Sequence, residues 1–246
     1  MITFDNVSFA YETGAPVLRG VSFHIAPGEA VGLIGANGAG KSTIMKLLLG
    51  LLPCTEGEIT VDGVRVEKKT LPQIRRTLGF VLQDSDSQMF MPTVYEDMMF
   101  APRNYGLSKE EAERKVDAVL EQLGLTELKH RHNHKISGGE KRMAAIATIL
   151  AMDPKAILMD EPSIALDPFN RRTVIHAING LAMTKLIASH DLDMILDTCL
   201  RVLLLSGGAL VADGSAEEIL RDQALLEANR MELPFCLSGY QLRNHE

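Results

Sequence analysis

The 246-residue sequence contains no tryptophan, only 5% aromatic residues and only three cysteines. Cys54, Cys199 and Cys236 are scattered along the chain without CxxC spacing, which argues against a zinc site and against a disulfide framework. Disulfides are typical of oxidising compartments, so this cysteine usage fits a protein of the reducing cytosol.

Long hydrophobic runs are also missing. No stretch reaches the roughly 18 consecutive apolar residues that indicate a membrane-spanning helix. The first five residues, Met1–Asp5, look like part of a strand and lack the basic segment and apolar core of a secretory signal. Any connection to a membrane is therefore expected to run through another chain.

The sequence has no excess of positive charge. It carries 25 Lys and Arg against 32 Asp and Glu, which gives a formal net charge of −7. Binding to nucleic-acid phosphates needs clustered Lys and Arg, and no such cluster stands out. We expect no nucleic-acid partner. The length and the 46% hydrophobic content permit one large domain or a core with an inserted subdomain.

The most informative motif is Gly35–Ser42, which reads Gly-Ala-Asn-Gly-Ala-Gly-Lys-Ser and fulfils the pattern GxxxxGK[ST]. The apolar run 30–34 before it predicts a strand, and the spacing of residues 42–49 predicts a helix. Glycines let main-chain N–H groups surround a polyphosphate at the start of that helix. Lys41 would add positive charge, and the Ser42 hydroxyl would bind Mg²⁺. The motif predicts a nucleotide site, but kinases, GTPases and transport motors all share it.

Polar side chains follow three further apolar segments that we predict as strands. In α/β sheets, ligands bind at the carboxyl ends of parallel strands. Asp160 could hold Mg²⁺, and Glu161 could take a proton from an attacking water. For His190, a structural role remains open beside a contact with the terminal phosphate. The side chains concerned are Gln83 after 78–82, Asp160 and Glu161 after 156–159, and His190 after 185–189.

A second anion-binding segment, Ser137–Glu140, reads Ser-Gly-Gly-Glu and leads into an Ala-rich helical run over 143–150. A hydroxyl and bare amides at a helix start meet the positive end of the helix dipole, about half an elementary charge. Other positions stay ambiguous. Tyr11 could stack on a base or fill the core, and Asp167 could cap a helix. Three histidines alternate with other residues, namely His130, His132 and His134. We expect them in a polar loop rather than in a metal site.

From residue 84 to about residue 152 the strand patterns give way to helical ones. Ser108 and Glu111 form a capping-box pattern before a helical repeat that runs to Gly124. The beginning of this stretch, 88–100, is rich in Met and Phe. Such side chains usually fill a core, but adaptable binding surfaces use them as well, so a groove for a partner is also possible.

Taken in their order along the chain, the motifs resemble those of the nucleotide-binding subunit of ATP-binding cassette (ABC) transporters, over residues 1–220. The resemblance implies an α/β fold: a P-loop NTPase (RecA-like) core with an N-terminal antiparallel β subdomain and an inserted α-helical subdomain. The core with its β subdomain would comprise 1–83 and 153–221, the helical signature subdomain 84–152, and the tail 222–246.

The resemblance implies ATP and Mg²⁺ as cofactors and ATP hydrolysis as the activity. It places Glu161 as catalytic base, His190 as sensor of the γ-phosphate, and Gln83 as the link from Mg²⁺ and water to the transport partner. Metal contacts would come from Ser42, Gln83 and Asp160. Nucleotide contacts would come from Tyr11 (adenine), from Gly35, Ala36, Asn37, Gly38, Ala39, Gly40, Lys41, Ser42 and Thr43 (phosphates), from the signature Ser137, Gly138, Gly139 and Glu140, and from Asp167 across a dimer interface.

The resemblance also implies partners. Two ATPase subunits, identical or different, would sandwich two ATP molecules, with each phosphate loop facing the other subunit's signature. Segment 83–97 is similar to that of the energy-coupling-factor type, which powers uptake of vitamins and of cobalt or nickel ions. This implies an importer with an integral membrane subunit and a peripheral position at the cytoplasmic face of the membrane. The alternative is a soluble ABC ATPase that acts on nucleic acid or a protein complex without a transporter.

Two positions depart from the family pattern. Glu140 stands where Gln is usual and adds negative charge near a triphosphate, with Lys141 or Arg142 expected to offset it. Ile164 stands where a small polar residue is commoner, which puts the fine geometry of the interface in doubt.

Overall fold

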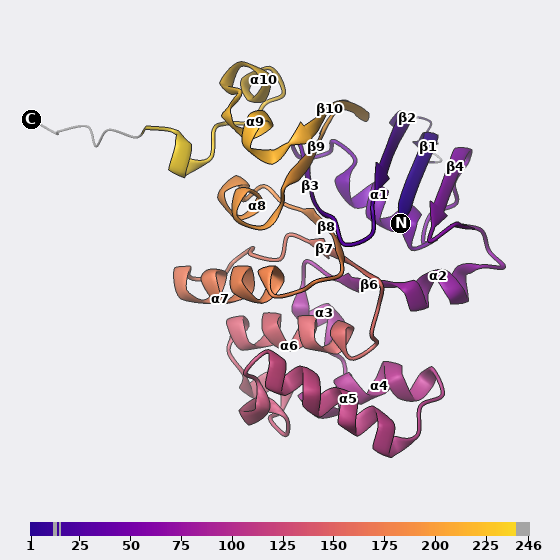
Figure 1. The fold of residues 1–246 in the computed structure, drawn as a ribbon, viewed down its shortest axis with the longest axis vertical. Coiled ribbons are helices and arrows are strands. Elements are labelled where there is room, and N and C mark those ends of the chain that lie inside the picture. The colour runs from indigo at the N-terminus through magenta and orange to yellow at the C-terminus, as the bar shows by residue number, and fades with distance from the viewer. Residues whose placement is uncertain (12–13, 15, 240–246) are drawn as a thin grey trace, which may run out of the picture.

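The structure is a computed structural model that describes residues 1–11, 14 and 16–239. The described strands form two sheets, and the helices lie around them (Figure 1). In chain order the elements are β1 (Ile2–Ala10), β2 (Pro16–Ile25), β3 (Ala30–Ile34), α1 (Lys41–Leu48), β4 (Glu56–Val61), β5 (Val64–Arg65), α2 (Leu71–Thr77), β6 (Leu78–Val81), α3 (Ser85–Gln88), α4 (Val94–Asn104), α5 (Lys109–Gln122), η1 (Thr126–Leu128), η2 (Asn133–Lys135), α6 (Gly138–Leu150), β7 (Ala156–Asp160), α7 (Pro168–Asn179), β8 (Thr184–Ala188), α8 (Leu192–Thr198), β9 (Arg201–Ser206), β10 (Ala209–Ser215), α9 (Ala216–Arg221), α10 (Gln223–Ala228) and η3 (Phe235–Leu237).

The larger sheet has the strand order β10-β9-β3-β8-β7-β6, and all of its neighbouring strands except β9 and β10 pair in parallel. Its central strands are apolar and buried, as expected for a sheet covered on both faces. Successive residues alternate between the two faces. On β7, Leu158 packs into one hydrophobic cluster, whereas Ile157 and Met159 pack into the other.

The two faces of this sheet carry different layers. Helices α6, α7, α8 and α9 contribute to the cluster on one face. Helix α1 and the smaller antiparallel sheet, of order β2-β1-β4-β5, contribute to the cluster on the other. Figure 1 shows β1, β2 and β4 beside α1, on the opposite side of the large sheet from α7 and α8. The α/β fold expected from the sequence is confirmed, with its N-terminal antiparallel sheet.

Tight turns join the hairpin strands of both sheets. The Asp62-Gly63 turn connects β4 and β5, with Val61 paired to Val64. The turn Gly207-Gly208 joins the antiparallel strands β9 and β10. Ser215 precedes α9 as its N-cap residue, but its side chain makes no capping hydrogen bond.

Between β6 and β7, all described elements are helical, from α3 to α6. The capping box predicted for Ser108 and Glu111 opens α5, and Thr93 with Glu96 forms a second one at α4. The division of the chain at residues 84 and 152 remains a prediction. Within the described ranges, the structure has no helix with the length and apolar character needed to cross a membrane.

Phe4 offers a test of the antiparallel layer. Its side chain is 2% exposed and stacks on Phe23 with ring centroids 4.5 Å apart. We predict that Phe4→Ala lowers the free energy of unfolding by about 3–5 kcal/mol, because it removes buried area and leaves a cavity. Urea unfolding followed by circular dichroism would measure this. Phe235→Ala is the matched control, since Phe235 is 80% exposed and the same change should stay within about 0.5 kcal/mol of the parent. Equal effects of the two changes would contradict the prediction.

Candidate functional site

The phosphate loop joins the end of β3 to the start of α1. Gly35 has φ of 147°, and a Cβ there would lie 2.3 Å from the carbonyl oxygen of Leu205. Gly40 has φ of 112° and is the N-cap of α1, where a Cβ would lie 2.6 Å from Leu18. Only glycine fits these two positions without a shift of the surroundings. The loop therefore folds back on β9 and β2 and leaves the N-terminus of α1 open to a ligand.

Lys41 is 7% exposed at the start of α1. Its Nζ donates to the carbonyl oxygen of Gly35 at 2.5 Å and lies 3.5 Å from Nδ1 of His190. Burial lowers the pKa of Lys41, and the charges of Glu161 and Asp160 partly oppose this shift. The ammonium group is thus held beside two carboxylates, where an incoming polyphosphate would supply a stronger counter-charge.

Oxygen side chains suited to magnesium gather beside the loop. The Ser42 hydroxyl donates to Oδ2 of Asp160 at 3.1 Å, which brings the loop and the end of β7 together. Gln83, after β6, lines the same pocket. A hydroxyl, a carboxylate and an amide oxygen are hard ligands that fit Mg²⁺ completed by phosphate oxygens and water. No group of three or more His, Cys, Asp or Glu side chains that could hold a metal ion occurs within the described chain.

Glu161 lies one residue beyond β7 and is 6% exposed. Its φ of 49° is unusual for a residue with a Cβ, and its N–H donates to the carbonyl oxygen of Ala188 at the end of β8. The carboxylate accepts from the Ser189 hydroxyl at 3.0 Å and from the main-chain N–H of His190 at 3.2 Å. Its other oxygen lies 3.0 Å from Nε2 of His190. This turn directs the carboxylate toward the end of the neighbouring strand and holds it there.

These groups line one pocket of about 410 Å³, a size typical of small-molecule sites. Gly35 and Ala36 face a neighbouring cleft instead. Among the described residues, neither the signature segment Ser137–Glu140 nor Asp167 belongs to the lining of this pocket. The structure therefore brings together most of the predicted nucleotide site but leaves the signature outside it. The lining residues are Tyr11, Val17, Asn37, Gly38, Ala39, Gly40, Lys41, Ser42, Thr43, Gln83, Asp160, Glu161 and His190.

The signature segment begins α6 with a capping box. Ser137 accepts from the Glu140 N–H through its hydroxyl, and the Glu140 carboxylate accepts from the Ser137 N–H at 2.7 Å. These hydrogen bonds from Ser137 lower the pKa of Glu140. The expectation that Lys141 or Arg142 pairs with Glu140 and offsets its charge is wrong. Lys141 pairs with Asp86, and Arg142 donates to the carbonyl oxygens of residues 82 and 83. Glu140 is thus the structural closing residue of the cap.

Asp167 is exposed and caps its own helix, α7. Its carboxylate accepts from the main-chain N–H groups of Phe169 at 2.9 Å and Asn170 at 3.0 Å. Asn170 in turn lies so close to Gly139 that a Cβ on Gly139 would be 2.1 Å from the Asn170 side chain. The second glycine of the signature therefore allows α6 and α7 to approach. Within the single chain, Asp167 therefore caps a helix, which is one of the two roles considered for it from the sequence.

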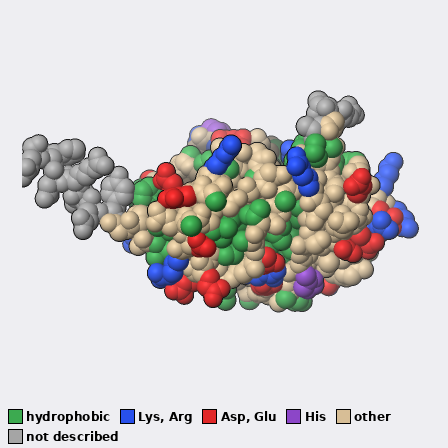
Figure 2. Space-filling model, turned by 90° about the horizontal axis from the view of Figure 1, so that it is seen from above, with side chains coloured by type: hydrophobic (Ala, Val, Ile, Leu, Met, Phe, Trp, Pro, Cys, Tyr) green, Lys and Arg blue, Asp and Glu red, His purple; other side chains and the backbone are tan. Residues whose placement is uncertain are grey.

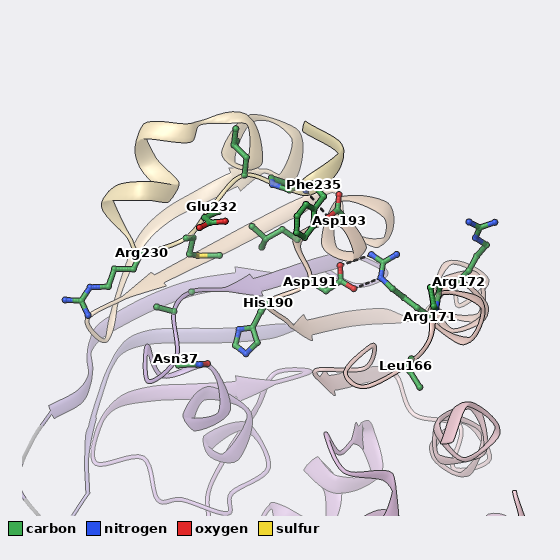
Figure 3. Close-up of a pocket in the computed structure, with 17 residues that line it drawn as sticks. Asn37, Leu166, Arg171, Arg172, His190, Asp191, Asp193, Arg230, Glu232 and Phe235 are labelled. Carbon is green, nitrogen blue, oxygen red and sulfur yellow. Dashed lines mark hydrogen bonds and ion pairs between the residues drawn. The ribbon is translucent and has the colours of Figure 1, made fainter. Parts of the chain in front are cut away.

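A wider cleft of about 910 Å³ adjoins the nucleotide pocket, and both are lined by Asn37 and His190. Figure 3 shows Arg171 and Asp191 facing each other on one side of this cleft, with Phe235 of the C-terminal segment on another. The guanidinium of Arg171 donates to both carboxylate oxygens of Asp191, at 2.6 and 2.7 Å. This pair lowers the pKa of Asp191 against the opposing effect of burial.

The structure also adds residues that the motifs did not indicate. Ser189 is fully buried and donates to Glu161, and Ser163 donates to Asp191 at 2.9 Å. A polar residue at an otherwise apolar strand end was the available signal for Ser189. Tyr11 is 41% exposed with its ring edge-on to Phe9, so the ring lies at the pocket rather than in the core. His132 and His134 are exposed, with ring centroids 5.3 Å apart.

Comparisons with known proteins agree with this geometry. Residues 18–164 match the ABC transporter family. An ABC transporter ATP-binding protein of Geobacter sulfurreducens is 44% identical over 97% of this chain and 96% of its own length. The energy-coupling factor transporter ATP-binding protein EcfA of Methanothermobacter thermautotrophicus is 41% identical over 95% of this chain and 77% of its own length.

Two solved structures extend the likeness to the fold. The structure of cbiO1 from Clostridium perfringens, described as part of the ABC transporter complex cbiONQ, superimposes with a TM-score of 0.84 at 30% identity and covers 92% of this chain and 93% of its own. A dimeric ATP-binding cassette in a post-hydrolysis state, bound to ADP and Pi, gives a TM-score of 0.78 at 27% identity over 88% of this chain and 99% of its own.

The capping role of Glu140 can be tested by two substitutions. Glu140→Gln keeps an oxygen that accepts from the Ser137 N–H, so we expect stability close to the parent. Glu140→Ala removes it, and we predict a loss of about 1 kcal/mol in the free energy of unfolding at pH 7. Because hydrogen bonding lowers the pKa of Glu140 in the folded state, this stabilisation is present above the unfolded pKa of about 4.3 and is lost as pH falls through the folded value.

Urea unfolding at pH 7 and at acidic pH would measure both effects. Glu110→Ala is the control, since Glu110 is an exposed residue in the first turn of α5 that does not close the capping box there. A loss in Glu140→Gln as large as that in Glu140→Ala would contradict the capping role.

Proposed function

This chain belongs to the ABC transporter family and is the ATP-binding, ATP-hydrolysing subunit of such a transporter, and from this premise we propose that it powers an importer of the energy-coupling-factor type. The cargo class that this type suggests is a vitamin or a cobalt or nickel ion. The named relative EcfA and the cbiO1 structure, part of a cbiONQ complex, support the assignment.

For the ATPase itself we propose a site shared by two subunits, and the observation that carries this proposal is the separation of the signature from the nucleotide pocket. Lys41, Ser42 and Glu161 surround the pocket, whereas Ser137–Glu140 lie outside its lining. The Glu140 N–H already donates to the Ser137 hydroxyl, so the N–H groups of Gly138 and Gly139 at the start of α6 would provide the anion site. A second subunit that places its signature over this pocket would complete the site. The dimeric cassette bound to ADP and Pi is a structural relative in which two copies assemble.

The proposed chemistry follows from the positions of the pocket residues. ATP would lie with its phosphates over the N-terminus of α1 and against Lys41. Glu161 would accept a proton from the water that attacks the γ-phosphorus, while the bond to the bridging oxygen of ADP breaks. Ser189 and the His190 N–H orient this carboxylate. Mg²⁺ held by Ser42, Asp160 and Gln83 would neutralise phosphate charge.

For a membrane partner, we propose an exposed aromatic pair as the docking surface. Phe90 is 63% exposed and Phe100 is 42% exposed, and their rings meet edge to face at 4.9 Å. Most methionines of the segment that the sequence suggested as a groove do not face the surface. Met89, Met98 and Met99 are buried in the hydrophobic cluster around α6 and cannot line an open surface. We call Phe90 and Phe100 the docking pair. Docking there would hold the subunit peripherally at the cytoplasmic face of the membrane.

The alternative, an ABC ATPase acting on nucleic acid, has less support. The net charge is −7. On the face shown in Figure 2, the described Lys and Arg side chains are interspersed with Asp and Glu and do not gather into one basic surface. Phosphate binding by proteins depends on such clustering.

Replacement of Glu161 tests the proposed base. We predict that Glu161→Gln lowers the ATP turnover rate on the order of 100-fold or more, because an amide cannot accept the proton. ATP binding should persist, and ATP should promote dimerisation, measured by light scattering. Glu58→Gln is the matched control on β4, since Glu58 pairs with the exposed Arg65. Unchanged turnover in Glu161→Gln would remove the assignment of the base, and failure of ATP to promote its dimerisation would remove the proposed sandwich.

Replacement of the docking pair tests the membrane partner. We predict that Phe90→Ala with Phe100→Ala lowers the yield of copurified integral membrane protein at least about tenfold, because exposed aromatic anchors carry much of the affinity of an interface. The ATP affinity of the isolated subunit should not change. Phe235→Ala, at an 80% exposed residue, serves as control. Copurification equal to that of the parent would exclude this docking surface.

A further inference from the structure

Two segments that are distant in the sequence lie side by side in the helical region. Segment 90–95 contains one residue of the docking pair, and segment 129–133 shortly precedes the signature. Their main chains are hydrogen-bonded three times. The donors and acceptors are Asn133 N to Pro92 O at 3.1 Å, Val94 N to Arg131 O at 3.2 Å, and Tyr95 N to Lys129 O at 2.9 Å. The backbone contact thus joins the docking region to the approach of the signature.

Asp97, on α4, lies at the centre of this contact and is 1% exposed. Its carboxylate accepts from the main-chain N–H groups of Phe90 at 3.2 Å and Met91 at 3.1 Å. The same carboxylate accepts from Nδ2 of Asn133, which also donates to the carbonyl oxygen of Met91 at 2.7 Å. One carboxylate and one amide therefore hold the loop that carries Phe90 against the segment that carries Asn133.

Asn133 is 8% exposed, and its Oδ1 is buried without a hydrogen-bond partner among the described residues. A buried polar atom left in this state is costly. The Nδ2 of the same amide offsets this cost, because it donates to the buried carboxylate of Asp97 and to the carbonyl oxygen of Met91. The amide at position 133 therefore serves mainly to join Asp97 and Met91 to the segment before the signature.

Asn133 begins the short turn η2, Asn133–Lys135, and Ile136 after it is 9% exposed. Ser137, the first residue of the signature, follows directly. The turn is stabilised by a hydrogen bond from Lys135 N to His132 O at 2.8 Å. Because this connection is short and hydrogen-bonded, a displacement of Asn133 would also displace Ser137.

We propose that Asp97 and Asn133 form a link that couples the docking pair to the signature, with Asn133 as a positioning residue for Ser137. A membrane partner that displaces Phe90 would move the signature through this link, and a signature bound to ATP on a second subunit would steady the docking loop. The two directions have the same coupling free energy. The inference rests on the proposed function, since it needs a signature that meets ATP in a dimer.

Hydrogen exchange of the Glu161→Gln protein, with and without saturating ATP, tests the link. ATP should slow amide exchange in 134–142, where the signature meets nucleotide, and also in 89–94, on the order of tenfold in each. In the protein that carries both Glu161→Gln and Asn133→Ala, amide exchange in 134–142 should still be slowed when ATP is saturating and the protein is dimeric. The slowing in 89–94 should disappear. Tyr95→Phe is the control, because it removes the hydrogen bond from Tyr95 to Glu113 in the same region without touching Asp97 or Asn133.

Two results would overturn the link: slowing in 89–94 that persists in the Asn133→Ala protein, or slowing in 134–142 without any in 89–94 when the link is intact. If Asn133→Ala does not fold, Asn133→Leu provides the same measurement, because it removes the Nδ2 donor and keeps a side chain of similar size. A Glu161→Gln protein that does not dimerise with ATP would refute the proposed function, and with it the premise of the link. This outcome is separate from the exchange results, because it is read from light scattering.

Discussion

The candidate site depends on the parallel pairing of β3, β8, β7 and β6. Their register places Leu33 beside Ala188 and Ile187 beside Met159, so the strands end at one edge of the sheet. The loops that follow carry the phosphate loop, His190, Glu161 and Gln83 to that edge. A slip of one residue would turn each apolar side chain into the cluster on the opposite face, where it would not fit the existing packing, so packing on both faces maintains the register and thereby the site.

Much of this arrangement could be predicted from the sequence. Apolar runs ending in polar residues identified the central strands, and the glycine pattern identified the phosphate loop. The partners of the functional side chains could not be predicted in the same way. Ser189 directly precedes His190 of the predicted site, yet only the main-chain direction at the end of β8 shows that its hydroxyl reaches Glu161. Glu140 differed from the family pattern, and its charge suggested a cationic partner, whereas the local geometry of α6 provides the Ser137 N–H instead.

The burial of the methionines in segment 88–100 could not be predicted from the sequence either. Met and Phe are equally suited to a core and to a binding surface, and composition alone does not separate the two. Met98 and Met99 face the interior on α4, while Phe100, next in sequence, is 42% exposed. The difference arises from the packing of α4 on α5 and α6, which depends on contacts between residues far apart in the chain.

Three residues of the nucleotide pocket and of the proposed link have a local conformation or environment that is energetically unfavourable. Glu161 has a left-handed backbone and a buried carboxylate, Lys41 is buried beside carbonyl oxygens, and Asn133 has an amide oxygen without a partner among the described residues. Each is unfavourable by local rules, and such exceptions are expected where function rather than stability determines the residue. Glu161 and Lys41 are in the nucleotide pocket, and Asn133 lies between the docking pair and the signature. These three departures lie at the nucleotide pocket and at the proposed link, whereas other left-handed residues such as Asp62 lie in turns outside them, so it is the position of a departure that connects it to function.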